Sequence, residues 1–230
     1  MLDKSKVVLI TGGSEGLGYE TAKILAPGNS VIIIAENKSK LQKVAKELGC
    51  DFHICDVVDS KKVKETIKKV IDKYGRIDCL INNAGVWCEG ELEKNTEAQI
   101  SKTLEVNVLG LILFTKELIP QMKKQREGLI INISSQAGLY AKAERSVYTA
   151  SKFAVTGFTE SLQLELKKHG IRVTGVYPGK LRTQLFEKVG INKDLSDALE
   201  PVEVAKAIEF IVSLPATTVI TELDIKSIEN

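Results

Sequence analysis

The chain has 230 residues, of which 43% are hydrophobic and 27% are charged. This composition is typical of a soluble globular protein and argues against a disordered, collagen-like or coiled-coil chain. The 32 Lys and Arg residues are dispersed and nearly balanced by 30 Asp and Glu residues. The charge pattern therefore indicates neither a nucleic-acid surface nor a polybasic membrane patch.

We expect no targeting signal at the start of the sequence. Met1 to Lys4 lead directly into a strand-like segment, without the apolar region and cleavage site of a signal peptide. No apolar run approaches the ~18 residues that cross a bilayer, so we expect a cytoplasmic protein. None of the four cysteines forms a CxxC pair and the two histidines lie far apart, so we expect no metal site and no disulfide framework.

Short apolar runs alternate with longer segments of helical periodicity along the chain. Strands are predicted at 7–11, 31–35, 52–55, 79–82, 129–134, 173–177 and 222–225. Helices are predicted at 17–25, 39–48, 63–74, 96–124 (one long helix or a broken pair), 146–168 and 201–214. Most strands are continuous apolar runs, which is typical of strands buried on both faces of a parallel sheet.

This alternation predicts the α/β class. We expect residues 1–230 to form a single doubly wound, Rossmann-like domain with a mostly parallel seven-stranded sheet flanked by helices. The segment 179–200 has weak periodicity, and we interpret it as a substrate flap within that domain.

A glycine-rich turn follows the first predicted strand and precedes the first predicted helix. Glycine allows a tight turn and lets the backbone approach a pyrophosphate, while the helix N-terminus offers free N–H groups. The spacing is Gly-x3-Gly-x-Gly, and no Gly-Lys-Ser/Thr of an NTPase P-loop occurs. A tight structural turn is the alternative, but the position between strand and helix favours a dinucleotide site. The predicted contacts here are Thr11, Gly12, Ser14, Glu15, Gly16, Leu17 and Gly18.

The second predicted strand leads into Glu36, beside the expected adenosine ribose. A carboxylate accepts hydrogen bonds from the ribose 2′-OH and repels a 2′-phosphate, so Glu36 favours NAD over NADP. Glu15 adds negative charge where a phosphate-binding cation would sit. Lys38 could reach a 2′-phosphate and Glu36 could be a solvated loop residue, so NADP stays open as the alternative.

Tyr148 and Lys152 lie four residues apart and share one face of a predicted helix. A free phenol has a pKa near ~10, and a nearby cation lowers it toward the range useful for proton transfer. Ser135 follows a predicted parallel strand, where a hydroxyl faces the ligand crevice and can bind a substrate oxygen. Ser134 would point elsewhere on the pleat. Taken singly, the Tyr–Lys pair could be a surface pair and the serine a helix cap.

Six motifs together resemble the short-chain dehydrogenase/reductase family, in its order and near its spacing, over about residues 5–185. They are Thr11-Gly12-x3-Gly16-x-Gly18, Asn82-Asn83-Ala84-Gly85, Val106-Asn107-Val108, Ile133-Ser134-Ser135, Tyr148-x3-Lys152 and Pro178-Gly179. Two features depart from the family pattern. The Asp common in NAD-dependent members would fall at Ala35, and the C-terminus lacks the familiar Asp-Gly-Gly.

The resemblance implies a role for each motif. Tyr148 would be the general acid/base, and Lys152 would lower its pKa and hold the nicotinamide ribose. Ser135 would orient the substrate oxygen, and Asn107 would anchor the water of a proton relay. Asn82 would support the sheet. The further cofactor contacts that the resemblance implies are Asp56, Val57, Asn83, Ala84, Gly85, Pro178, Gly179 and Thr183.

The walls of the substrate pocket are less specified. The segments 86–88, 139–140 and 181–186 are mostly apolar, which suggests a hydrophobic or medium-sized ketone, aldehyde or alcohol. We interpret Arg145 and Arg182 as solvated surface residues, with contact to an anionic group as the alternative.

These observations predict an NAD(P)-dependent oxidoreductase that moves a hydride between a nicotinamide and a carbonyl or secondary-alcohol carbon. A nicotinamide-binding redox sensor or scaffold is the alternative. An epimerase or dehydratase on the same fold is a second one, although such branches usually carry a larger C-terminal lobe. The resemblance also implies a homodimer or homotetramer formed through the helices at 96–124 and 146–168. We expect a small-molecule substrate, and from the charge pattern no nucleic-acid or membrane partner.

Overall fold

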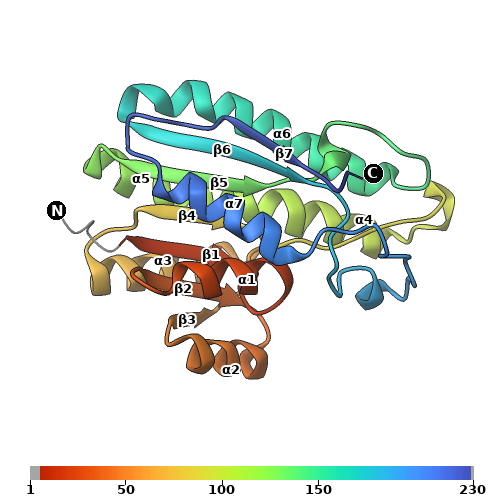
Figure 1. Ribbon diagram of the computed structural model, residues 1–230, viewed down its shortest axis with the longest axis horizontal. Helices are drawn as coiled ribbons and strands as arrows, with labels where there is room; N and C mark the ends of the chain where they lie inside the picture. Colours follow the sequence, from red (N-terminus) through yellow and green to blue (C-terminus); the bar gives the residue numbers. More distant parts are fainter. Residues whose placement is uncertain (1–5, 229–230) are drawn as a thin grey trace.

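A computed structural model describes residues 6–228, and its centre is one sheet of seven parallel strands in the order β3-β2-β1-β4-β5-β6-β7 (Figure 1). The strands are β1 (Val7–Thr11), β2 (Ser30–Ala35), β3 (Asp51–Ile54), β4 (Cys79–Asn82), β5 (Gly128–Ile133), β6 (Ile171–Pro178) and β7 (Glu222–Ile225). The predicted doubly wound α/β fold is confirmed. Met1 to Lys4, where we expect no signal peptide, lie outside the described residues.

Helices cover both faces of this sheet. They are α1 (Gly16–Leu25), α2 (Lys38–Leu48), α3 (Ser60–Tyr74), α4 (Glu97–Leu104), the π-helical turn η2 (Glu105–Gly110), α5 (Leu111–Gln125), α6 (Ser146–Leu166) and α7 (Pro201–Ser213). Short 3-10 turns occur at η1 (Leu92–Lys94), η3 (Gln136–Gly138), η4 (Lys167–His169) and η5 (Glu187–Val189). Among the helices of residues 6–228, none combines the length and apolar character needed to cross a membrane.

The alternation of side chains along each strand divides the core into two layers. Val8 and Ile10 of β1 belong to the layer that contains α1, α2 and α7, and α1 and α7 lie in front of the sheet in Figure 1. Val7 and Leu9 pack on the opposite face with α3, α5 and α6. Both faces are therefore buried, which explains why the strands are continuous apolar runs.

Local polar residues set the helix ends that the periodicity left open. Asn37 and Asp59 accept backbone N–H groups at the starts of α2 and α3, and Thr96 begins α4 with a capping box. Gly49 and Gly75 end α2 and α3 in the left-handed conformation that glycine adopts without strain. These caps place the helices within one to three residues of their predicted starts.

The predicted helix at 96–124 is the broken pair, because the π-helical turn η2 separates α4 from α5. Pro120 sits inside α5 and does not end it. The predicted flap at 179–200 contains only the turn η5 and an isolated parallel bridge between Leu181 and Leu199. Its weak periodicity therefore corresponds to an irregular segment.

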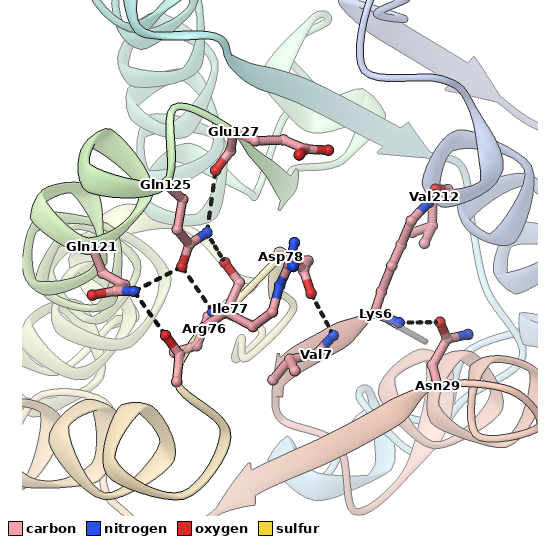
Figure 2. A network of polar contacts seen from close by, with 11 residues as sticks. Lys6, Val7, Asn29, Arg76, Ile77, Asp78, Gln121, Gln125, Glu127 and Val212 are labelled. Carbon is pink, nitrogen blue, oxygen red and sulfur yellow. Dashed lines mark hydrogen bonds and ion pairs between the residues drawn. The ribbon is translucent and has the colours of Figure 1, made fainter. Parts of the chain in front are cut away.

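A polar network closes the sheet edge where the strands begin (Figure 2). The side-chain amide of Gln125 accepts the N–H of Ile77 at 3.1 Å and donates to its carbonyl at 2.9 Å. Asp78 accepts the N–H of Val7 at 2.8 Å, and Gln121 donates to Gln125 at 2.9 Å. These bonds fix the starts of β1 and β4 from one side, so both strands end together at the opposite edge.

Candidate active site

A cavity of about 790 Å³ opens at the edge where the parallel strands end. The strand order reverses between β1 and β4, which is where open α/β sheets form their ligand crevice. Residues following β1, β4, β5 and β6 line it, together with the start of α6 and part of the segment 179–200. Residues of α2 line it as well, so stretches from most of the chain contribute to one site.

The glycine turn after β1 can be built only from glycine at three points. Gly12 and Gly16 have φ values of +68° and +54°, in the left-handed region. A Cβ atom on Gly18 would lie 2.2 Å from the carbonyl oxygen of Gly12, so α1 packs directly on the turn. A Cβ on Gly12 would lie 2.9 Å from the Cα of Ala84. This close packing leaves the N-terminus of α1 open toward the cavity.

The segment after β4 is bonded to the same turn. The hydroxyl of Thr11 accepts the N–H groups of Asn83 and Ala84 at 3.0 and 3.1 Å. The Asn83 side chain donates to the carbonyls of Thr11 and Gly12 at 3.0 and 3.2 Å. The two segments thus form one rigid cradle of backbone, and its shape and free helix N-terminus suit a pyrophosphate.

Most of the predicted cofactor contacts meet around the cavity. Those that line it are Gly12, Ser14, Glu15, Gly16, Leu17, Asn83, Ala84, Gly85, Tyr148, Lys152, Pro178, Gly179 and Thr183.

Five predicted contacts are not among the lining residues. Thr11 and Gly18 shape the turn from behind. The Asp56 side chain accepts the N–H of Val58 at 3.1 Å. The Val57 side chain packs directly against Gly110, where a Cβ would lie only 2.6 Å from it. The fifth residue, Glu36, has an exposed side chain just beyond β2. The cofactor roles of all five stay predictions.

Tyr148, Lys152 and Ser135 converge on the cavity wall below β5. The Lys152 Nζ lies 5.7 Å from the centroid of the Tyr148 ring and donates to the Ile133 carbonyl at 3.0 Å. The Ser135 hydroxyl accepts the N–H of Ala137 at 3.1 Å, and this side chain lowers the pKa of Tyr148. Ser134 also lines the cavity, and its hydroxyl donates to the Lys152 carbonyl at 3.1 Å.

Burial governs the ionisation of this pair. It raises the pKa of Tyr148 to about 12, against smaller lowering effects of the Ser135 side chain and the Arg145 charge. It lowers the pKa of Lys152 to about 8. Burial raises the pKa of Tyr148 by more than the neighbouring cation, Arg145, lowers it. The lowering of this pKa by Lys152 therefore stays a prediction.

Asn107 lies within the π-helical turn η2, and such turns widen the helix at functional sites. Its side chain is buried, accepts the N–H of Val86 at 2.8 Å and donates to the Val86 carbonyl at 3.0 Å. A third bond runs to the hydroxyl of Ser151 at 3.1 Å. Asn107 therefore holds the chain beside Gly85 to the second turn of α6.

The cavity has an aromatic wall opposite the glycine turn. The ring centroid of Trp87 lies 4.2 Å from that of Tyr148 and 4.8 Å from that of Phe186. Glu89 accepts the indole N–H of Trp87 at 3.0 Å. Burial raises the pKa of Glu89, but hydrogen bonds from Lys193 and Trp87 outweigh burial and lower it.

Sequence reasoning missed two charged residues of this wall, Glu89 and Lys193, which the fold brings together across 104 positions. Trp87 carried the one local signal for Glu89, because a buried indole N–H needs an acceptor. A second group of charges lies at the other end of the cavity, where Glu15 pairs with Lys40 at 3.0 Å and with Lys188.

Comparisons with known proteins agree with this geometry. The model of the short chain dehydrogenase family matches residues 6–194. A 3-oxoacyl-(acyl-carrier-protein) reductase of Thermotoga maritima is 35% identical over 225 residues, which cover 91% of each chain. The L-fucose dehydrogenase of Bos taurus is 33% identical over 95% of this chain and 87% of its own length.

A solved structure has the same architecture over nearly the whole chain. The alcohol dehydrogenase of the archaeon Thermococcus sibiricus, complexed with 5-hydroxy-NADP, superposes with a TM-score of 0.90. It is 28% identical, and the match covers 98% of each chain. With the family motifs in place around one cavity, the chain belongs to the short-chain dehydrogenase/reductase family of oxidoreductases.

Proposed function

We propose that this enzyme transfers a hydride between NAD or NADP and a carbonyl or secondary-alcohol carbon, with Tyr148 as the general acid/base. The observation that carries the proposal is the convergence of Tyr148, Ser135 and Lys152 on the cavity that the glycine turn also lines. The bound 5-hydroxy-NADP of the Thermococcus sibiricus enzyme supports a pyridine dinucleotide as the class of cofactor.

The cradle of this chain fits such a cofactor. Backbone at Gly12 and Gly16 and the N-terminus of α1 would hold the pyrophosphate, and Gly179 and Thr183 would lie beside the nicotinamide. When bound, the nicotinamide supplies or accepts the hydride.

The chain's own residues would manage the proton. The Tyr148 hydroxyl donates a proton to a carbonyl oxygen or accepts one from an alcohol, and Ser135 holds that same oxygen. Lys152 would hold the ribose hydroxyls, and its ammonium favours the phenolate. Asn107 keeps the segment at Val86 in place and would anchor the water that connects Lys152 to solvent.

Replacing Tyr148 with Phe tests the proposal. Tyr148→Phe should lose about 10²–10⁴-fold in turnover of a ketone or alcohol followed at the nicotinamide absorbance, while it still binds the cofactor. Tyr140→Phe is the matched control, because Tyr140 lines the same cavity but is mostly exposed. Full turnover by Tyr148→Phe would refute the assignment. Cofactor binding by the wild type without turnover of any carbonyl or alcohol would favour the sensor or scaffold.

We also propose that NAD is preferred over NADP. The exposed Glu36 after β2 and Glu15 in the turn support NAD, whereas Lys40 and Lys43 line the cavity and favour a 2′-phosphate. Titrations with NADH and NADPH decide between them. Glu36→Gln should reduce the ratio of NADH affinity to NADPH affinity. An equal reduction in Glu20→Gln would show that the total charge of the site, and not the position of Glu36, sets the preference.

The remaining predictions concern the whole chain. We propose one domain over residues 1–230, with 179–200 as its substrate flap, and a homodimer or homotetramer formed through α4, α5 and α6. The exposed apolar side chains of Leu104, Phe153 and Leu164 on these helices support the assembly. Light scattering after gel filtration measures the molar mass of the assembly, and a monomer at all concentrations would contradict the proposed dimer or tetramer. The cytoplasmic location stays a prediction.

A further inference from the structure

Three charged side chains meet at the substrate end of the cavity. Glu89 follows β4, Arg145 precedes α6, and Lys193 lies in the segment 179–200. One carboxylate oxygen of Glu89 accepts from the Arg145 Nε at 3.3 Å and from the Lys193 Nζ at 2.6 Å. The side chains are only 14–24% exposed, so solvent screens them incompletely. Two cations share one anion, which leaves a single positive charge.

That charge faces the cavity. Arg145 and Lys193 line it, whereas Glu89 lies behind them. The bond to Glu89 uses the Nε–H of Arg145, so this pair leaves the two terminal nitrogens of the guanidinium unused. Those nitrogens form the planar fork that matches a carboxylate. A carboxylate carries one negative charge, which equals the surplus.

The same corner contains an aromatic cluster, and its Trp87 lines the cavity with 8% of its surface exposed. The Arg145 guanidinium carbon lies 5.2 Å from the centroid of the Trp87 ring, and that ring contacts both Tyr148 and Phe186. Arg145 is the N-cap residue of α6, three residues before Tyr148. A ligand whose oxygen meets the Tyr148 hydroxyl would therefore lie against Trp87 and reach the cations within the length of a small molecule.

We propose that the substrate of this enzyme is an aromatic or planar carbonyl or alcohol compound bearing one carboxylate. Arg145 and Lys193 bind the carboxylate, and Trp87 packs against the ring. This inference rests on the proposed function and specifies its substrate class. It differs from the sequence-based interpretation of Arg145 as a solvated residue, because the fold places Lys193 and Trp87 beside it.

The single tryptophan of the chain is Trp87, so its fluorescence reports binding at this wall directly. We would titrate the protein with phenylacetate and with its neutral isostere phenylacetamide. The wild type should bind phenylacetate at least about tenfold more tightly. Equal affinities, or no fluorescence change with phenylacetate at any attainable concentration, would overturn the proposal.

Substitutions test which residues produce the selectivity. Arg145→Met and Lys193→Met each cancel the surplus charge and should reduce the acid-to-amide affinity ratio to near one. Glu89→Gln should raise the ratio, because it frees both cations. Arg182→Met is the matched control, since Arg182 also lines the cavity but pairs one-to-one with Glu200. If Arg145→Met does not fold, the variants at 89 and 193 still decide. An unchanged ratio in the Met variants would refute the assignment.

Turnover separates this inference from the proposed function. The wild type should reduce 4-acetylbenzoate with a KM about tenfold below that for its methyl ester. Reduction of both with equal KM would refute the anion site and leave the hydride transfer standing. Selective binding of phenylacetate without turnover of any carbonyl or alcohol would refute the hydride transfer and leave the anion site standing.

Discussion

Lys152 is buried, and its pKa is lowered from 10.5 to about 8 by burial. Below pH 8 the ammonium is charged in both the folded and the unfolded chain, so the full cost of burying the charge is present. Between pH 8 and 10.5 the folded chain has released a proton that the unfolded chain keeps. Unfolding then takes up a proton, and the free energy of unfolding rises with pH.

Lys152→Met removes this contribution, and its magnitude follows from the two pKa values. The cost of burying the charged ammonium is about 3 kcal/mol at pH 7.5 and about 1 kcal/mol at pH 9.5. The wild type should therefore gain about 2 kcal/mol relative to Lys152→Met over that interval. Taking the difference between the two proteins cancels other groups, such as the buried Cys79 thiol, whose pKa burial raises to about 12.

Urea denaturation followed by the fluorescence of Trp87 measures both proteins across this interval. The interval ends below pH 10, because Tyr148 has a pKa of about 12 in the folded chain against 10 when free and begins to contribute there. Lys102→Met, at an exposed position of α4, controls for the loss of one charge. Parallel stability curves for wild type and Lys152→Met would refute the reasoning that burial controls this lysine.

Four further substitutions test the site and its support. Gly18→Ala places a Cβ 2.2 Å from a backbone carbonyl oxygen, so it should abolish cofactor binding and destabilise the chain by more than about 2 kcal/mol. Gly157→Ala places its Cβ in open space within α6 and should stabilise the chain by about 0.5–1 kcal/mol. Similar urea midpoints for the two variants would contradict this expectation. Asn82→Ala leaves two buried acceptors without their donor and should cost about 1–3 kcal/mol in urea unfolding, so a neutral effect would show that water replaces the amide. Glu15→Gln breaks two partly exposed ion pairs and should change stability by less than about 1 kcal/mol, and a larger loss would mean that Lys188 anchors the segment 179–200.

The regular elements were predictable because their causes are local. β1, β4 and β7 have the predicted bounds, since short apolar runs between polar turns define a buried strand. β6 begins two residues earlier than predicted, at Ile171, and its first two residues pair with β5. The charged Arg172 interrupts the apolar run there, so the pattern did not indicate the start of the strand. The π-helical turn was not predictable, since its apolar pattern continues through residues 105–110.

The site divides in the same way. Tyr148 and Lys152 are four residues apart on one helix, so the sequence alone places them on one face. Glu89 and Lys193 meet only because the irregular segment 179–200 crosses the end of the sheet, and no periodicity in that segment indicates the contact. Neighbours within one helix turn can be read from spacing, whereas contacts made by irregular segments depend on the whole fold.

Burial and nearby charges together determine whether the Tyr148 hydroxyl donates or accepts a proton. A phenol with a pKa of about 12 keeps its proton at neutral pH, and forming the phenolate at pH 7 costs about 7 kcal/mol. The chain is therefore set to donate a proton, and alcohol oxidation requires cations that favour the phenolate. Arg145 already lowers the pKa of Tyr148, and Glu89 balances only half of the charge of Arg145 and Lys193. A carboxylate bound between those cations would weaken their effect on Tyr148, so such a substrate would keep the phenol protonated and favour carbonyl reduction.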